Sequence, residues 1–196
     1  TVDTPLTNEI LLKFKSTGGF NDEIDITYAG ILCFIAAEKL NKNPTEFISE
    51  VLDNADDSGI IYAENFLSKI NVGISDVKVI LGYPSTDKND LIHSTFDQLF
   101  FGPELYSKIF QKKSKFSEKG FIENDRVIVN SELVETLKKK FDDKIAIVTG
   151  RGFDAISSSL KEILKQFNVE NSVFLEDESR DLAKPNPQSL IRAMKG

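Results

Sequence analysis

Two short segments of this sequence combine residue types that suit a phosphate group. In the first, Thr149-Gly150-Arg151 follows an apolar run, so that a hydroxyl is expected at the tip of a strand. The adjacent glycine lets a ligand approach the backbone closely. The helix expected next offers free N–H groups and the positive end of its dipole, and both favour an anion. The alternative is that Thr149 only caps that helix.

The second segment, Lys184-Pro185-Asn186-Pro187, lies 35 residues after Thr149. Its two prolines stiffen the backbone behind a single lysine, whose charge complements a phosphate. The alternative is a surface lysine ahead of a helix that begins with proline. Because ligands bind beyond the carboxyl ends of parallel strands, we predict that Thr149 and Lys184 converge on one anion site.

The elements expected to position these segments alternate between strand and helix after residue 120. The segment 144–148, apolar after Lys144, is typical of a parallel strand that is covered on both faces, and 172–175 is expected to form a second short strand. Helical periodicity marks 131–141 and 153–167, and Asn186 is expected to cap a final helix that begins with Pro187. This order predicts an α/β fold, with residues 121–196 forming part of a doubly wound, Rossmann-like parallel sheet.

The sequence before residue 120 is mostly helical and predicts a separate helical domain over residues 1–120. Thr7 is a plausible N-cap for a first helix, which Gly18-Gly19 would end. Further helices are expected over 26–40, from Pro44 onward, over 61–70 and over 91–100.

Composition excludes several classes of protein. The 196 residues include 24 basic and 31 acidic side chains, a net charge of −7, which argues against a broad surface for nucleic acid or anionic membrane. The longest apolar run, 28–37, is about half of the roughly 20 residues that a membrane span requires. One cysteine excludes a disulfide framework. Since no secretory signal is visible at the N-terminus, a cytoplasmic protein is expected.

Together the two loops resemble motifs of the haloacid dehalogenase (HAD) superfamily. Thr149-Gly150-Arg151 resembles its second motif, and Lys184-Pro185-x-Pro187 resembles its third. The resemblance implies that Thr149 and the adjacent amide hold the transferring phosphoryl group and that Gly150 and Arg151 contact the substrate. It also implies that Lys184 neutralises the nucleophile and the phosphate. The helical domain fits the cap that subfamily I inserts between its first and second motifs.

Residues 15–22 are similar to the opening of the cap in one poorly characterised branch of that superfamily. By this resemblance Phe20 and Asn21 are candidate substrate contacts. Phe20 follows a glycine pair that frees its backbone and could aim it at the site. Ordinary packing within the cap is the alternative.

Two parts of the superfamily pattern are missing from this sequence. The Asp-x-Asp pair that supplies nucleophile and general acid should precede Gly18, where Asp3 is the sole aspartate. The acidic Mg²⁺-binding motif should follow Gly196. We therefore expect these residues to form a cap and half of a core, without phosphatase activity of their own.

The resemblance implies a Mg²⁺-dependent phosphatase that acts on a small phosphorylated metabolite through an aspartyl-phosphate. One alternative is a non-catalytic module that binds a phosphorylated ligand or another partner, and another is a metal-free dehalogenase. The acidic residues before Lys184 either add charge near that lysine or form a solvated loop; they are Glu176, Asp177, Glu178 and Asp181. Cys33 and His93 are expected to be structural.

Overall fold

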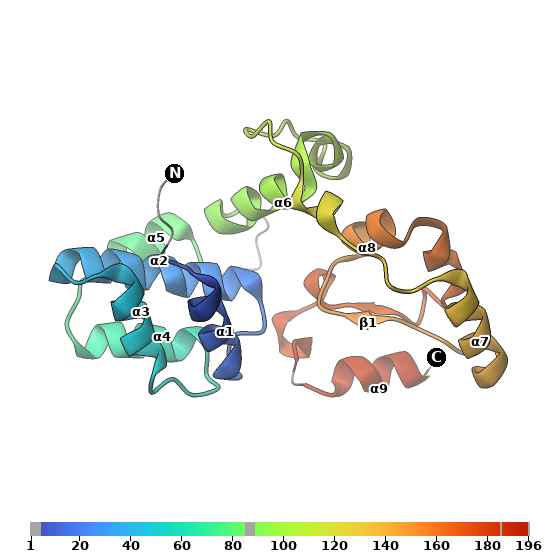
Figure 1. Ribbon diagram of the computed structural model, residues 1–196, viewed down its shortest axis with the longest axis horizontal. Coiled ribbons are helices and arrows are strands. Elements are labelled where there is room, and N and C mark those ends of the chain that lie inside the picture. Colours follow the sequence, from blue (N-terminus) through green and yellow to red (C-terminus); the bar gives the residue numbers. More distant parts are fainter. Residues whose placement is uncertain (1–4, 85–88, 185, 196) are drawn as a thin grey trace. The chain divides into compact units, whose positions relative to one another are not determined.

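The structure is a computed structural model that describes residues 5–84, 89–184 and 186–195; Asp3 and Pro185 lie outside these ranges. The chain forms two compact units, unit 1 over Thr1–Phe96 and unit 2 over Asp97–Gly196. The division therefore falls within helix α6 (Leu91–Phe110), whereas the sequence placed a boundary near residue 120. Figure 1 shows the elements of both units.

The regular secondary structure among the described residues of unit 1 is all helical. Its helices before α6 are α1 (Asn8–Ser16), α2 (Glu23–Leu40), α3 (Pro44–Leu52), α4 (Ile60–Lys69) and α5 (Ser75–Leu81). Helix α2 is central, because it packs against α3, α4 and α5. It buries Tyr28, Leu32 and Ala36 completely, as expected of a helix that is apolar around most of its circumference.

Short polar side chains define where these helices begin. The hydroxyl of Thr7 accepts the N–H of Ile10 at 3.3 Å, which confirms Thr7 as the N-cap of α1. Asn43 caps α3 in the same way, directly before Pro44. Helix α2 starts three residues earlier than predicted because the Asp22 carboxylate accepts an N–H of its first turn.

The loop after α1 crosses the start of α4 at very short range. A Cβ atom on Gly19 would lie 2.4 Å from the backbone nitrogen of Gly59, and one on Gly59 would lie 2.4 Å from the Gly19 oxygen. Gly59 also has a φ of +61°, which favours glycine. The glycine pair predicted to end α1 therefore also permits this backbone contact.

Unit 2 contains helices around a very small sheet. Its α-helices and strands are the remainder of α6, α7 (Ser131–Phe141), β1 (Val148–Thr149), α8 (Phe153–Leu160), β2 (Val173–Phe174) and α9 (Gln188–Lys195). Its 3₁₀ turns are η1 (Phe121–Asn124), η2 (Lys161–Gln166), η3 (Leu175–Asp177) and η4 (Arg180–Leu182). Helix α6 kinks at Gly102, where φ is +71°.

The two strands pair in parallel, with Val148 opposite Val173 and Thr149 opposite Phe174, which confirms the predicted pairing. They run between α8 and α9 in Figure 1, and α9 packs against both strands. The strands are shorter than predicted. The N–H of Ile147 donates to the hydroxyl of the buried residue Ser172 at 3.0 Å, so a side chain replaces a backbone partner there.

The predicted doubly wound, Rossmann-like parallel sheet is wrong for the described residues. Among them, Val148–Thr149 and Val173–Phe174 form one two-stranded sheet, and most of the remaining residues are helical. Of the segment 144–148 only Val148 enters the ladder, and Ala146 within it is exposed to solvent. An unbroken apolar run indicated a buried strand, but whether such a strand is covered depends on neighbours that the pattern does not specify.

Candidate functional site

The loop after β1 presents a hydroxyl group next to an open stretch of backbone. Thr149 ends β1, and its Oγ1 accepts the N–H of Arg151 at 3.2 Å. A hydroxyl that accepts in this way keeps its own proton available for donation. Beside it, a Cβ atom built on Gly150 would meet no atom within 4 Å. The loop therefore has a potential donor and room for a ligand next to each other.

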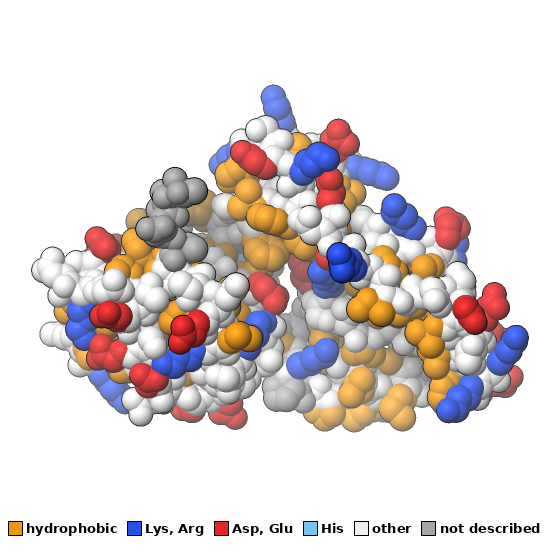
Figure 2. All heavy atoms as spheres, viewed as in Figure 1, with side chains coloured by type: hydrophobic (Ala, Val, Ile, Leu, Met, Phe, Trp, Pro, Cys, Tyr) orange, Lys and Arg blue, Asp and Glu red, His pale blue; other side chains and the backbone are white. Residues whose placement is uncertain are grey.

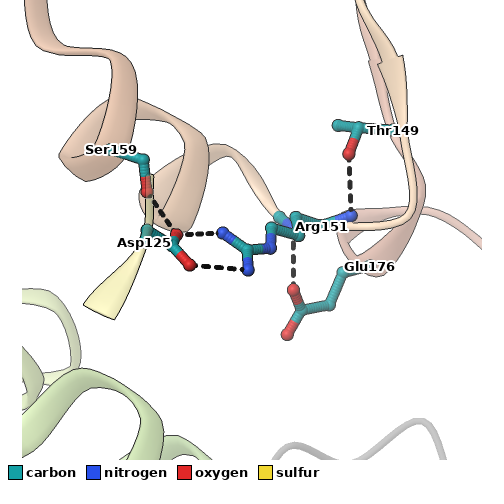
Figure 3. Close-up of polar contacts among 6 residues, drawn as sticks. Asp125, Thr149, Arg151, Ser159 and Glu176 are labelled. Carbon is teal, nitrogen blue, oxygen red and sulfur yellow. Dashed lines mark hydrogen bonds and ion pairs between the residues drawn. The ribbon is translucent and has the colours of Figure 1, made fainter. Parts of the chain in front are cut away.

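The side chain of Arg151 is held by a carboxylate. Its Nη2 donates to Oδ1 of Asp125 at 3.0 Å, and its Nη1 donates to Oδ2 of the same residue, which makes a bidentate pair (Figure 3). The guanidinium carbon also lies 5.4 Å from the centre of the Phe100 ring. The sequence analysis assigned Arg151 to substrate contact, but the positive charge of its side chain is paired with Asp125 of the same chain.

Asp125 itself has a second partner. The hydroxyl of Ser159, from the last turns of α8, donates to its Oδ2 at 2.8 Å. The hydrogen bond from Arg151 is the main cause that lowers the pKa of Asp125 below its ordinary value, and the bond from Ser159 adds to it while partial burial opposes both. Asp125 is therefore a stable anion at neutral pH.

The first amides of α8, where the sequence suggested a phosphate, carry two carboxylates of the chain. The N–H of Gly152 donates to Oε2 of Glu176 at 2.7 Å, and the N–H of Phe153 donates to Oδ2 of Asp177 at 2.6 Å. Both acids belong to η3, directly after β2. The helix terminus does attract anions, as its dipole predicts, but these anions are internal.

Sequence reasoning missed these acceptors and Asp125. Glu176 and Asp177 were interpreted as a solvated loop or as charges near Lys184, and Asp125 was not considered. Their position in the sequence could have indicated them, because Glu176 and Asp177 follow β2 just as the Thr149 loop follows β1. Parallel pairing then brings the two loops to the same end of the sheet.

Lys184 is exposed to solvent and follows η4. Within the described part of the chain, no hydrogen bond or ion pair joins Lys184 to the Thr149 loop, so the predicted convergence of the two stays a prediction. Asn186 accepts the N–H of Gln188 at 2.9 Å and donates to the carbonyl of Asp181 at 2.6 Å. The cap role predicted for Asn186 is confirmed.

Phe20 and Asn21, which the resemblance placed in a cap, lie in unit 1. Phe20 is 1% exposed, and its ring meets the edge of Phe14 at a centroid distance of 4.8 Å. It therefore packs as a core residue, which was the alternative to a role in substrate binding. Asn21 is exposed and donates from Nδ2 to the carbonyl of Gly18 at 3.1 Å.

Other reactive side chains have structural environments. Burial raises the pKa of the Cys33 thiol to about 12, so that it is not a nucleophile at neutral pH. His93 contacts Asp90, with 2.7 Å between Nδ1 and Oδ2. Across the described ranges, no three His, Cys, Asp or Glu side chains are grouped so that they could hold a metal ion. Nor does any helix within them have the length and apolar character that crossing a bilayer requires.

Comparison with known proteins gives a fold likeness alone. No model of a protein family matches the chain, and no curated protein matches it. An X-ray structure solved by the Northeast Structural Genomics Consortium, its target ZR25, is similar over 100% of this chain and 67% of its own, with a TM-score of 0.58 and 18% identity. At that identity the likeness shows a shared fold and carries nothing about activity.

Proposed function

We propose that this chain binds the phosphoryl group of a small phosphorylated metabolite at the Thr149 loop, as part of phosphomonoester hydrolysis of the HAD type. The observation that carries the proposal is the arrangement after β1, where the Thr149 hydroxyl accepts from Arg151 beside open space at Gly150. The resemblance of Thr149-Gly150-Arg151 and Lys184-Pro185-x-Pro187 to two superfamily motifs supports the assignment to phosphate.

In this proposal the Thr149 hydroxyl donates to a phosphoryl oxygen, and the backbone at Gly150 lets that oxygen come close. Lys184 supplies the positive charge that offsets the phosphate, because Arg151 is already paired with Asp125. Charge-assisted hydrogen bonds of this kind are the strong ones in anion recognition. No residue of this sequence is assigned as the nucleophile, so the proposal for this chain concerns the binding of the phosphoryl group.

The resemblance also implies Mg²⁺, and the described residues do not fit a site for it. Hard cations of this type require several oxygen ligands, yet no group of three suitable side chains occurs among the residues that the structure places. The two acids that reach the loop, Glu176 and Asp177, accept α8 amides instead.

The test is a titration of the 196-residue protein with inorganic phosphate and with p-nitrophenyl phosphate, followed by amide NMR shifts. We expect the largest shifts at Gly150 and Arg151. Thr149→Val removes the hydroxyl and keeps the shape, and we expect it to weaken binding roughly 10-fold or more, as for one hydrogen bond to a charged group. Thr136→Val is the matched control, since that hydroxyl only back-bonds to Glu132 within α7.

Two results would overturn the proposal. One is the absence of any shift at residues 149–151 over the whole titration. The other is equal affinity in the wild type and the Thr149→Val variant, because the hydroxyl would then contribute nothing to anion binding.

A second candidate, a non-catalytic module that binds a phosphorylated ligand, is favoured by one specific observation. The α8 amides are occupied by Glu176 and Asp177, so fewer groups remain to stabilise the extra charge of a transition state. Hydrolysis of the phosphate ester by the 196-residue protein is measured with and without Mg²⁺. Because no residue of this sequence is assigned as the nucleophile, turnover that Thr149→Val abolishes would show that the chain does supply one and would exclude the module. Binding without turnover agrees with the module.

A further inference from the structure

We propose that Asp125 is the positioning residue of the Thr149 loop and that it acts on Thr149 through Arg151. The inference rests on the proposed function only for its consequence, the affinity for phosphate. Its structural part, the orientation of the Thr149 hydroxyl, can be tested without any ligand.

The carboxylate of Asp125 connects three segments of the chain. Asp125 follows η1, holds the guanidinium of Arg151 with both oxygens, and accepts from Ser159 on α8 (Figure 3). A bidentate pair restrains the plane of the guanidinium as well as its distance. The ring of Phe100 provides a further contact for the same group. The side chain of Arg151 is thereby held from two sides.

Arg151 is in turn hydrogen-bonded to Thr149. The residue whose side chain Asp125 holds is the one whose backbone N–H donates to Thr149 Oγ1 at 3.2 Å. This bond occupies a lone pair of the hydroxyl and directs its proton elsewhere. Figure 3 shows Thr149 on the far side of Arg151 from Asp125. Among the described residues no hydrogen bond joins Asp125 directly to Thr149, and the hydrogen bonds that connect the two run through Arg151.

The ion pair between Arg151 and Asp125 is partly exposed to solvent. The side chains of Arg151 and Asp125 are 42% and 23% exposed. Ion pairs of such exposure contribute little to global stability, so the loss of this pair should alter the loop much more than the folding of the unit. A positioning role and a merely structural role therefore predict different measurements.

The experiment compares Asp125→Asn, which keeps the shape and removes the charge, with Ser159→Ala, which breaks the other bond to the same carboxylate. Amide hydrogen exchange is measured without ligand, and the dissociation constant for inorganic phosphate is then taken from the Gly150 amide shift. For Asp125→Asn we expect exchange at the Arg151 amide to rise about tenfold and phosphate affinity to fall about tenfold. For Ser159→Ala we expect less than a twofold change in both, with the unfolding midpoint of both variants near that of the wild type.

A double-mutant cycle tests the route through Arg151. In an Arg151→Ala background, Asp125→Asn should produce no further change in phosphate affinity, because the connection is already broken. An additional loss in that background would overturn the proposed route.

The remaining outcomes each decide one question. A uniform rise in exchange across unit 2 together with a lower unfolding midpoint would show a structural role and overturn the inference. Tighter phosphate binding by Asp125→Asn would show that the charge opposes the anion, and would also overturn it. A selective rise at the Arg151 amide in a protein that binds no phosphate would support the positioning role and contradict the proposed function.

Discussion

Unit 1 and unit 2 are stabilised in different ways. Unit 1 has a continuous buried cluster that extends from Ile10 to Ile92, whereas the cluster of unit 2 is built around Phe101, Tyr106 and Ile122. Apolar side chains gather on the surface over α9 in Figure 2; in that helix Leu190 is 55% and Met194 84% exposed. The candidate site lies in the unit with less buried apolar surface, and its loop is held mainly by polar contacts.

Charge divides between the units as well. Unit 1 has seven basic and 15 acidic residues, a formal charge of −8, while unit 2 has 17 basic and 16 acidic residues. The overall charge of −7 that argued against anionic partners therefore belongs to unit 1. An average over the chain concealed a near-neutral unit, in which a local anion site is electrostatically reasonable.

The largest effect is expected from truncation in the core of unit 1. Leu67, in α4, is 0% exposed, so Leu67→Ala should leave a cavity and lower the free energy of unfolding by about 2–5 kcal/mol in a urea titration. Leu190→Ala is the matched control in unit 2 and should change it by less than about 0.5 kcal/mol. Equal losses in the two variants would contradict the difference in burial between these two leucines.

The next largest effect is expected at the glycine crossings, which both units contain. Gly19→Ala forces a Cβ onto the Gly59 backbone, and Gly120→Ala forces one to 2.4 Å from the carbonyl carbon of Phe101. Each should lower the free energy of unfolding by about 1–3 kcal/mol, because backbone must move. Gly150→Ala, which meets nothing within 4 Å, should leave stability almost unchanged. If Gly120→Ala left the free energy of unfolding unchanged while Gly19→Ala lowered it, the backbone of unit 2 would be shown to shift and accept the extra Cβ where that of unit 1 does not.

A smaller effect is expected from the pH dependence of the Asp125 ion pair in unit 2. Because the folded protein lowers the pKa of Asp125, its contribution to stability is complete above the ordinary value of about 3.9 and is lost as pH falls through the lowered value. The pair is partly exposed, so the difference in Tm between the wild type and Asp125→Asn should be small, largest above about pH 5, and smaller still below about pH 3. A difference that stays constant with pH would exclude the carboxylate charge as its cause.

The smallest effect is expected at Asp56 in unit 1, which is the exposed counterpart of Asp125. Hydrogen bonds from the hydroxyl and the N–H of Ser58 lower the pKa of this carboxyl, which is fully exposed to solvent. Carbon-detected NMR titration should give Asp56 a pKa below the ordinary value, and Ser58→Ala should return it toward that value. The Tm of Asp56→Asn should follow that of the wild type at every pH, and any clear divergence would contradict the screening expected at the surface.

Helix positions could be predicted because their determinants are local. Thr7 and Asn43 each accept an N–H within the next three residues, and α7 spans the residues that its periodicity indicated. The strands could be predicted only in position and direction. Their length depends on Ser172, whose hydroxyl accepts the Ile147 amide from 25 residues away. The hydrophobic pattern of a segment does not reveal that a polar side chain elsewhere will accept a backbone hydrogen bond in place of the neighbouring strand.

The sequence by itself determined which loop would carry a hydroxyl and a glycine at the end of a strand, because Thr149 and Gly150 are adjacent and the strand before them has a local pattern. Only the tertiary structure decided what surrounds that loop. Asp125 lies 26 residues before Arg151, and Glu176 lies 24 residues after Gly152. The pairing of β1 with β2 brings Glu176 to the loop, and hydrogen bonds from Arg151 and Ser159 hold Asp125 there. Interactions over such separations follow from the packed arrangement of several elements, and that arrangement cannot be derived from any one segment of the chain.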